Sequence, residues 1–93
     1  MVHLVSYDLI KPVKDYAKLE TRLKQLDAKK VLLSQWVLVS PSDAAAIWTD
    51  LRTYVDSNDR LLVLQLRRAG AWNDHSLLVS DDEMRYVLQM AGA

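Results

Sequence analysis

Asp8 is the residue best placed to take part in metal binding or catalysis, because it follows an apolar segment, residues 2–7, that has the character of a central strand. Strand-favouring side chains alternate onto both faces of this segment, as in a strand covered on both sides. Pro12 has no backbone N–H and biases Lys11 toward an extended conformation, so strand pairing should end by about Lys11 and leave Asp8 near the rim of the sheet. One carboxylate does not complete a Mg²⁺ site. If two copies of the chain formed a symmetric dimer, Asp8 of the second copy would supply a second carboxylate. The alternative is that Asp8 caps the turn after the strand.

The other polar candidates have weaker signals. His3, inside the first segment, is interpreted as a packed, hydrogen-bonded side chain rather than a general base, and His75 lies in a predicted exposed loop, where it could contribute to a phosphate contact. Trp72 would either pack at the interface between two copies of the chain or stack on a nucleic-acid base, and we favour the interface. Two pairs of basic residues stand next to predicted strands: Lys29 with Lys30, and Arg67 with Arg68. Each pair is either solvated or contacts nucleic acid, and a dimer would present each pair twice.

Composition narrows the function classes. The 93 residues contain 12 basic and 12 acidic side chains, and this balance argues against a protein that coats nucleic acid through bulk charge. The chain has no cysteine and two histidines, so neither a disulfide framework nor a thiolate or histidine-rich metal site is expected. No apolar run approaches the ~20 residues of a membrane helix, and no signal-peptide pattern is present. We therefore expect a cytoplasmic protein that is not in the membrane.

The first half of the chain is predicted to place two helices and a strand pair after the opening strand. A first helix, capped by Asp15, runs to about Ala28. The next twelve residues, 29–40, are interpreted as two strands, 30–33 and 35–39, with one long bent strand as the alternative. A second helix begins with Ser40 as N-cap and Pro41 at the first helical position, and the Asp43 side chain is placed to accept from the Ser40 backbone N–H. Its apolar stripe should face the core and comprises Ala44, Ile47, Trp48, Leu51 and Val55.

The second half of the chain is predicted to form one more strand and a C-terminal extension. Residues 60–66 are mostly apolar and are interpreted as a strand beside the first one, buried on both faces. A loop follows over residues 67–75, and residues 77–79 look like a short strand added to a sheet edge. A last helix, capped by Ser80 or Asp81, is expected through Gln89.

This order predicts one α+β domain over residues 1–93, with a core over 1–68 and a C-terminal extension over 69–93. Strand, helix, strand pair, helix and strand fold into an antiparallel sheet with both helices on one face, the ferredoxin-like βαββαβ sandwich. The helices leave the other sheet face open, and we expect no third layer in a chain of this length. A homodimer that packs sheet against sheet would cover it.

Three short motifs resemble those of a known family. They are Ser6-Tyr7-Asp8 at the strand end, Ser34-Gln35-Trp36-Val37 before the second helix, and Asn58-Asp59-Arg60-Leu61-Leu62-Val63 in the last main strand. Together they resemble the Cas-two family of CRISPR-associated adaptation proteins and its stand-alone SinR-like relatives, over about residues 2–72.

The resemblance implies a ferredoxin-like homodimer with one of two activities. Some members are Mg²⁺-dependent endonucleases of RNA or DNA, and others are non-catalytic scaffolds that grip duplex DNA beside an integrase-type partner. Asp8 would be the catalytic metal ligand, with Tyr7 before it and Trp36 beside the site. The basic residues expected after the first strand are present as Lys11 and Lys14, and lysine lacks the planar fork with which arginine grips phosphate.

Two functions therefore remain open from the sequence. The first is a metal-dependent endonuclease in which paired Asp8 side chains hold Mg²⁺. The second is a non-catalytic dimeric module that binds nucleic acid or a protein partner. The Tyr7-Asp8 strand end favours the first, whereas the zero net charge and the lysines in place of arginines favour the second.

Overall fold

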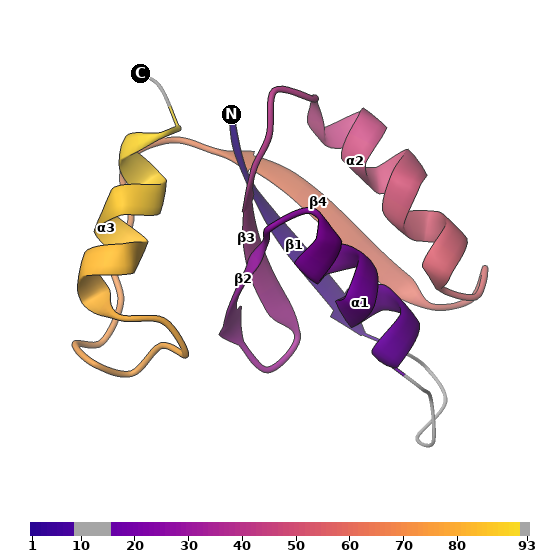
Figure 1. Cartoon of the computed structure of the whole chain (residues 1–93), viewed down its shortest axis with the longest axis horizontal. Helices are drawn as coiled ribbons and strands as arrows, with labels where there is room; N and C mark the ends of the chain where they lie inside the picture. The colour runs from indigo at the N-terminus through magenta and orange to yellow at the C-terminus, as the bar shows by residue number, and fades with distance from the viewer. Residues whose placement is uncertain (9–15, 92–93) are drawn as a thin grey trace.

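The computed structural model describes residues 1–8 and 16–91, which form an α+β fold with an antiparallel sheet (Figure 1). The elements of this described part are β1 (Val2–Asp8), α1 (Ala17–Gln25), β2 (Lys29–Leu32), β3 (Gln35–Val39), α2 (Ala44–Leu51), the 3₁₀ turn η1 (Arg52–Tyr54), β4 (Arg60–Leu66) and α3 (Asp81–Gln89). None of the helices in these two ranges is long and apolar enough to cross a membrane.

The sheet has the strand order β2-β3-β1-β4, with every neighbouring pair antiparallel. β1 is central, and its Leu4 is opposite Val37 of β3 and Leu64 of β4. This is the strand order that a βαββαβ chain adopts in a ferredoxin-like fold, so the predicted fold class is confirmed. The strand pair after α1 is two strands joined by a turn at residues 33 and 34, as favoured over one bent strand.

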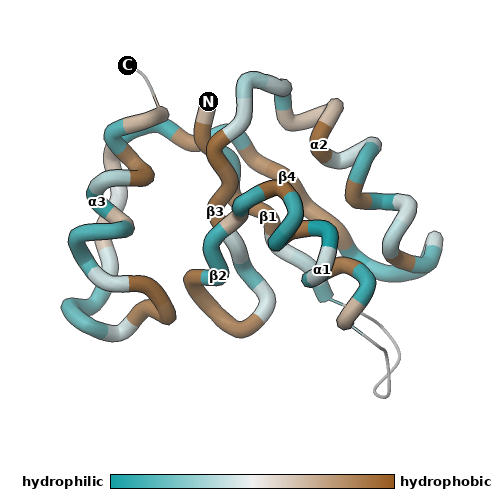
Figure 2. Tube along the Cα trace, viewed as in Figure 1, coloured by the Kyte–Doolittle hydropathy of each residue, from teal (hydrophilic) through white to brown (hydrophobic). Residues whose placement is uncertain are grey.

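The two helices α1 and α2 cover the same face of the sheet. Leucines from α1, Leu19 and Leu23, and Ile47 and Leu51 from α2 join one buried cluster with alternate residues of β1 and β3. In Figures 1 and 2, the mostly hydrophobic β1 passes behind α1, and the mostly hydrophobic β4 runs between α1 and α2 in this view. We call this the helical face.

The opposite face is partly covered by α3, which corrects the expectation that the chain has no third layer. Val87 of α3 packs with Val2, Val31 and Val37 in a second buried cluster. Figure 1 shows α3 on the other side of the sheet from α1 and α2. The extension supplies this layer because Met84 and Val87, together with the adjacent Leu88, give α3 an apolar stripe.

The part of this second face near β4 stays open, so the prediction that β4 is buried on both faces is wrong. Leu62 is 51 % exposed and Leu64 is 46 % exposed, while Leu4 beside them on β1 is half-buried. We call Leu4, Leu62 and Leu64 the open strip. β4 is partly buried at Leu61 and Val63, which pack against the cluster under α1 and α2, and at Leu66, which packs against the second cluster.

The ends of α1 differ from the predicted ones. Asp15, the expected cap, lies outside the described residues, and Tyr16 occupies the N-cap position without a capping side-chain hydrogen bond. The helix ends at Gln25 rather than near Ala28, because the Ala28 N–H donates to the Leu23 carbonyl and the Asp27 N–H donates to the Lys24 carbonyl. This is a Schellman end with Asp27 at φ 60°, a left-handed position that aspartate tolerates.

The start of α2 is also shifted. Asp43, not Ser40, is the N-cap, and its Oδ1 accepts from the Ala46 N–H at 2.8 Å. Ser40 Oγ instead accepts from the Ser42 N–H at 3.1 Å, a local turn that precedes the helix. Pro41 therefore lies before the helix and not at its first position.

The predicted add-on strand at residues 77–79 is wrong. These residues form bends, and the backbone contact to the edge strand β2 is one hydrogen bond from the Leu78 N–H to the Val31 carbonyl. Of the two caps predicted for α3, the structure has Ser80 at the N-cap, and Ser80 and Glu83 form a reciprocal capping box.

Candidate functional site

Asp8 is the last residue of β1 and is opposite Arg60, the first residue of β4. Arg60 Nη1 donates to Asp8 Oδ2 at 2.8 Å, and the two side chains are 72 % and 65 % exposed. The expected rim position is therefore observed. Because water screens such a pair, its contribution to folding is at most about 1 kcal/mol. The turn that Asp8 would cap lies outside the described residues.

The Asp8 end of the sheet is polar and borders the open strip. Residues directly opposite in the ladder share a face, so Asp8, Arg60 and Ser6 lie on the same face as Leu62 and Leu64. Gln35 Nε2 donates to Ser6 Oγ at 3.3 Å on this face. A partner that packed on the open strip would meet the Asp8–Arg60 ion pair at its margin.

Tyr7 and Trp36 lie on the helical face, where both are buried. Trp36 Nε1 donates to the Tyr7 hydroxyl at 3.1 Å, and the Tyr7 ring lies 5.6 Å from the Tyr16 ring. Burial raises the pKa of Tyr7 despite the opposing hydrogen bond from Trp36. Their role in this arrangement is packing beneath the helices, because strand alternation turns both side chains away from the face that carries Asp8.

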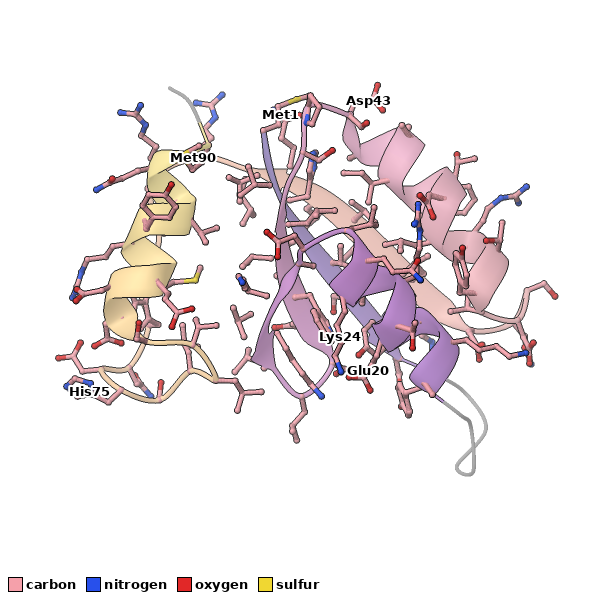
Figure 3. The ribbon with its side chains drawn as sticks, in the orientation of Figure 1. Met1, Glu20, Lys24, Asp43, His75 and Met90 are labelled. Carbon is pink, nitrogen blue, oxygen red and sulfur yellow. The ribbon has the colours of Figure 1, made fainter. Side chains whose placement is uncertain are left out.

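The lysines differ in how strongly they are already paired. Lys30 Nζ contacts Glu20 Oε2 at 3.2 Å and lies 6.0 Å from the centre of the Trp36 ring. Glu20 extends from α1 on the side of the hairpin in Figure 3. Lys29 is exposed, with a long contact of 3.8 Å to Asp27. Lys11 and Lys14 lie outside the described residues.

Arg67 and Arg68 directly follow β4 and are exposed. Within residues 1–8 and 16–91, neither guanidinium has an ion-pair partner. Of the described basic residues predicted to contact nucleic acid, this pair is the most available for an external anion, because no internal carboxylate competes for it.

His3 is fully buried on the helical face. Its Nε2 donates to the Ser42 carbonyl at 2.9 Å, and Nδ1 has no hydrogen-bond partner among the described residues. Burial lowers the pKa of His3 below its ordinary value of 6.5, with the Ser42 contact opposing it. The interpretation of His3 as a packed side chain fits these contacts.

Asp81 holds the segment before α3 through side-chain hydrogen bonds that its sequence position did not reveal. Its Oδ1 accepts from Trp72 Nε1 at 3.0 Å and from the His75 N–H at 3.2 Å. These contacts, the Trp72 one first, lower the pKa of Asp81. Trp72 is thus held within its own chain, and the guanidinium carbon of Arg85 lies 6.0 Å from the centre of its ring. His75 is exposed on the loop before α3, at the opposite end of the helix from Met90 (Figure 3).

Arg60 is the partner that sequence reasoning missed. The signal is present, since residues 60–66 were predicted to lie beside the first strand. The register that sets Asp8 against Arg60 depends on the whole β1–β4 ladder, in which a shift of one residue would turn Arg60 to the other face.

One chain offers a single carboxylate, Asp8, to a magnesium site at this rim. Mg²⁺ in proteins takes one or two carboxylates with waters and substrate phosphates in octahedral geometry. Here Asp8 already accepts from a guanidinium, and no group of three acidic or histidine side chains gathers at a candidate metal position in the described part of the chain. A second carboxylate at this position would come from a second copy of the chain.

No protein-family model matches the sequence, and a search of the solved structures finds no match.

Proposed function

We propose that this protein is a Cas-two-like homodimer that binds RNA or DNA as a non-catalytic module. The observation that carries the proposal is the open strip, in which Leu62 and Leu64 are 51 % and 46 % exposed on one sheet face and Leu4 beside them is half-buried. A second copy of the chain is the partner proposed for this strip.

The open strip is self-complementary in its chemistry. Leu62 and Leu64 offer apolar area, while Asp8 and Arg60 at the margin carry both signs of charge on every copy. Two copies related by a two-fold axis would bury the leucines and place opposite charges within reach of each other. Burying apolar surface contributes roughly 25 cal/mol per Å², which is the driving force for such pairing.

The nucleic-acid part of the proposal is supported by Arg67 and Arg68. Arginine contacts phosphate oxygens in pairs through its planar fork, and these two arginines have no internal ion-pair partner in the described part of the chain. A dimer would present four such side chains, so a chain with no net charge would still carry a local basic surface.

The experiment compares wild type with Leu64→Asp by light scattering. Wild type should have twice the 10.6 kDa mass of the chain, and Leu64→Asp should be monomeric, because a carboxylate in an apolar interface is strongly unfavourable. Leu33→Asp is the matched control, since Leu33 is 82 % exposed in the β2–β3 turn and should leave the dimer intact. A monomeric wild type at micromolar concentration would contradict the dimer.

Binding is measured by fluorescence anisotropy with a labelled duplex at about 50 and 200 mM salt. Replacing Arg67 and Arg68 by glutamine should lower affinity and reduce the salt slope by about one for each phosphate that the variant no longer neutralises. The charge-matched control replaces the exposed Lys18 and Lys24 of α1 by glutamine. An equal decrease in affinity in both double variants would mean that binding is unspecific charge attraction.

A metal-dependent endonuclease is the second candidate, favoured by one observation. Asp8 borders the open strip, so a second copy on the strip would bring a second Asp8 toward the first. Two such carboxylates would repel each other unless a cation or a proton were shared between them. An integrase-type protein partner is part of the same family expectation and would be tested by co-purification.

A further inference from the structure

The sheet face that carries the open strip continues under α3. Val2 and Val37 are buried there, in the cluster that packs against α3. In the ladder Leu4 is opposite Val37 on one side and Leu64 on the other, and Val2 is opposite Leu66. Because residues directly opposite in a ladder share a face, the covered valines and the open leucines form one apolar surface. α3 divides this surface into a covered half and an open half.

The open half alone is small for a stable dimer. A standard interface buries roughly 800 Å² on each partner. Leu62 and Leu64 are 51 % and 46 % exposed, and Leu4 beside them is half-buried. The valines under α3 would extend the apolar surface from β4 across β1 and β3 to β2. A second copy could bury much more area on the whole face than on the open strip.

Few contacts hold α3 on the sheet. Val87 is the α3 side chain that is buried in the cluster with the sheet valines, and Met84 packs partly against it. The backbone contributes the hydrogen bond from the Leu78 N–H to the Val31 carbonyl at 3.0 Å. A groove of about 270 Å³, lined on the helix by Val87 and Met90, remains between α3 and β3. Segments with few buried apolar contacts are the ones that open most readily.

The polar contacts of α3 stay within the extension. In residues 1–8 and 16–91, the side-chain hydrogen bonds and ion pairs of α3 all go to residues 72–85, as between Asp81 and Trp72. Leu88 is buried against Gly70, where an added Cβ would meet Leu88 Cδ1 at 3.0 Å. The extension can therefore leave the sheet as one body, without losing these contacts.

The link between β4 and this body is suited to a hinge. Residues 67–71 are exposed and form neither helix nor strand. In Figure 1 the chain leaves the sheet along this link and then runs beside α3 to the start of the helix. Rotations in such a connection are how one element moves relative to another. β4 would keep its ladder with β1 when α3 moves.

We propose that α3 is a displaceable cover of the dimer surface: in a single chain it shields the valines of the sheet face, and in the dimer a second copy takes its place. This inference rests on the proposed homodimer and adds how its formation is controlled. The two contacts exclude each other, so the apparent affinity of the dimer is reduced by the fraction of chains in which α3 is closed. Loosening α3 should therefore tighten the dimer.

Hydrogen exchange of the full chain, at concentrations below and above the Kd of the dimer, tests the proposal, with the mass followed by light scattering. The α3 amides should exchange faster in the dimer, because a helix of 9 residues without its sheet contact is barely stable in water. The amides of β1 and β3 should keep their protection. A dimer in which α3 is protected as well as in the monomer would overturn the cover and leave the homodimer in place.

Val87→Ala is a second test, and its expected sign is opposite to that of an ordinary loss of packing. The substitution weakens the contact of α3 with the sheet, so the Kd of the dimer should decrease by about ten-fold or more. Tyr86→Ala is the matched control on the same helix, since its ring is 64 % exposed, and it should leave the Kd unchanged. An unchanged or increased Kd in Val87→Ala would contradict the proposal.

Adding Leu64→Asp to Val87→Ala identifies the surface that the dimer uses. The double variant should be monomeric, because the introduced carboxylate lies on the same sheet face that α3 uncovers. Association that persists in the double variant would mean that the loosened helix itself binds other copies, and the cover would be wrong. If wild type and Val87→Ala were both monomeric at every concentration, the homodimer itself would be refuted, and the cover with it.

Discussion

Asp8 and Asp81 show that the surroundings of a carboxylate, not its place at the end of an element, determine its role. Asp8 is mostly exposed and has one guanidinium partner across the β1–β4 ladder. Asp81 is buried at the start of α3 and accepts from an indole N–H and a backbone N–H. Asp8 is therefore free to change partners at low cost, whereas Asp81 holds a loop in place.

Asp8→Asn tests the second candidate function at this scale. The fold should persist, with a change in the free energy of unfolding of at most about 1 kcal/mol, because the ion pair that it removes is exposed. On the proposed non-catalytic function, neither wild type nor Asp8→Asn should cleave RNA or DNA with Mg²⁺ present. The measurements are a cleavage assay with and without Mg²⁺ and thermal unfolding of the same preparations.

Arg60→Gln is the matched control, since it breaks the same ion pair and keeps the carboxylate. Cleavage by wild type and Arg60→Gln that disappears in Asp8→Asn would establish Asp8 as a metal ligand and contradict the non-catalytic proposal.

At the scale of elements, helices and strands were predictable where one local signal dominated. The start of α3 was predicted with Ser80 or Asp81 as its cap, and the structure has Ser80 at the N-cap, where Glu83 completes a capping box. Ser40 and Asp43 both have capping chemistry, and the choice between them depends on the turn that Ser40 and Ser42 form. Residues 77–79 have strand-like composition, but only one backbone hydrogen bond reaches β2, so no ladder follows.

Ser80→Ala should loosen α3 from the sheet. The substitution removes the acceptor for the Glu83 N–H, which costs about 1 kcal/mol at an N-cap. Hydrogen exchange of the α3 amides should therefore speed up by about five-fold, while the amides of β1 and β3 keep their protection. Ser57→Ala, at an exposed position before β4, is the control. Equal exchange of α3 in wild type and Ser80→Ala would mean that packing of Val87 and Leu88 alone holds the helix.

For the whole molecule, the order of elements was sufficient to predict the ferredoxin-like sheet, because short connections allow few alternatives. The layers were not predictable in the same way. Periodicity shows that α3 has an apolar face but not which sheet face it covers, and this decides that Leu62 and Leu64 stay open. The exposure of Trp48 likewise depends on how α2 lies over β4, since its spacing alone matches that of the buried Ile47 and Leu51.

Two carboxylates with lowered pKa values make the fold less stable in strong acid. Arg22 donates to both oxygens of Asp50 from α1 to α2, and these hydrogen bonds lower the pKa of Asp50 from its ordinary 3.8. The pKa of Asp81 is shifted in the same direction. A carboxylate with a lowered pKa stabilises the fold above its unfolded pKa, and this contribution disappears as pH falls below about 4. A decrease in stability that begins at higher pH therefore requires another group.

His3 is that group. Its pKa in the folded chain lies below 6.5 because burial disfavours the charged ring; the N-terminus lowers it further, while the Ser42 carbonyl and Asp43 oppose the shift. As pH falls through 6.5, the unfolded chain takes up the proton first, so the free energy of unfolding should decrease from pH 7 to 5, by up to about 1.4 kcal/mol per pH unit. Urea unfolding at a series of pH values measures this slope.

His3→Gln keeps an N–H donor for the Ser42 carbonyl but does not titrate, so its slope between pH 7 and 5 should be nearly flat even if the variant is less stable throughout. His75→Gln removes the exposed histidine and should retain the slope of wild type. Each variant removes one of the two imidazoles of the chain. Comparing them therefore shows whether the pH dependence of the free energy of unfolding comes from the buried or from the exposed histidine. A slope that persists in His3→Gln and vanishes in His75→Gln would instead place the acid-sensitive group at the Asp81 loop.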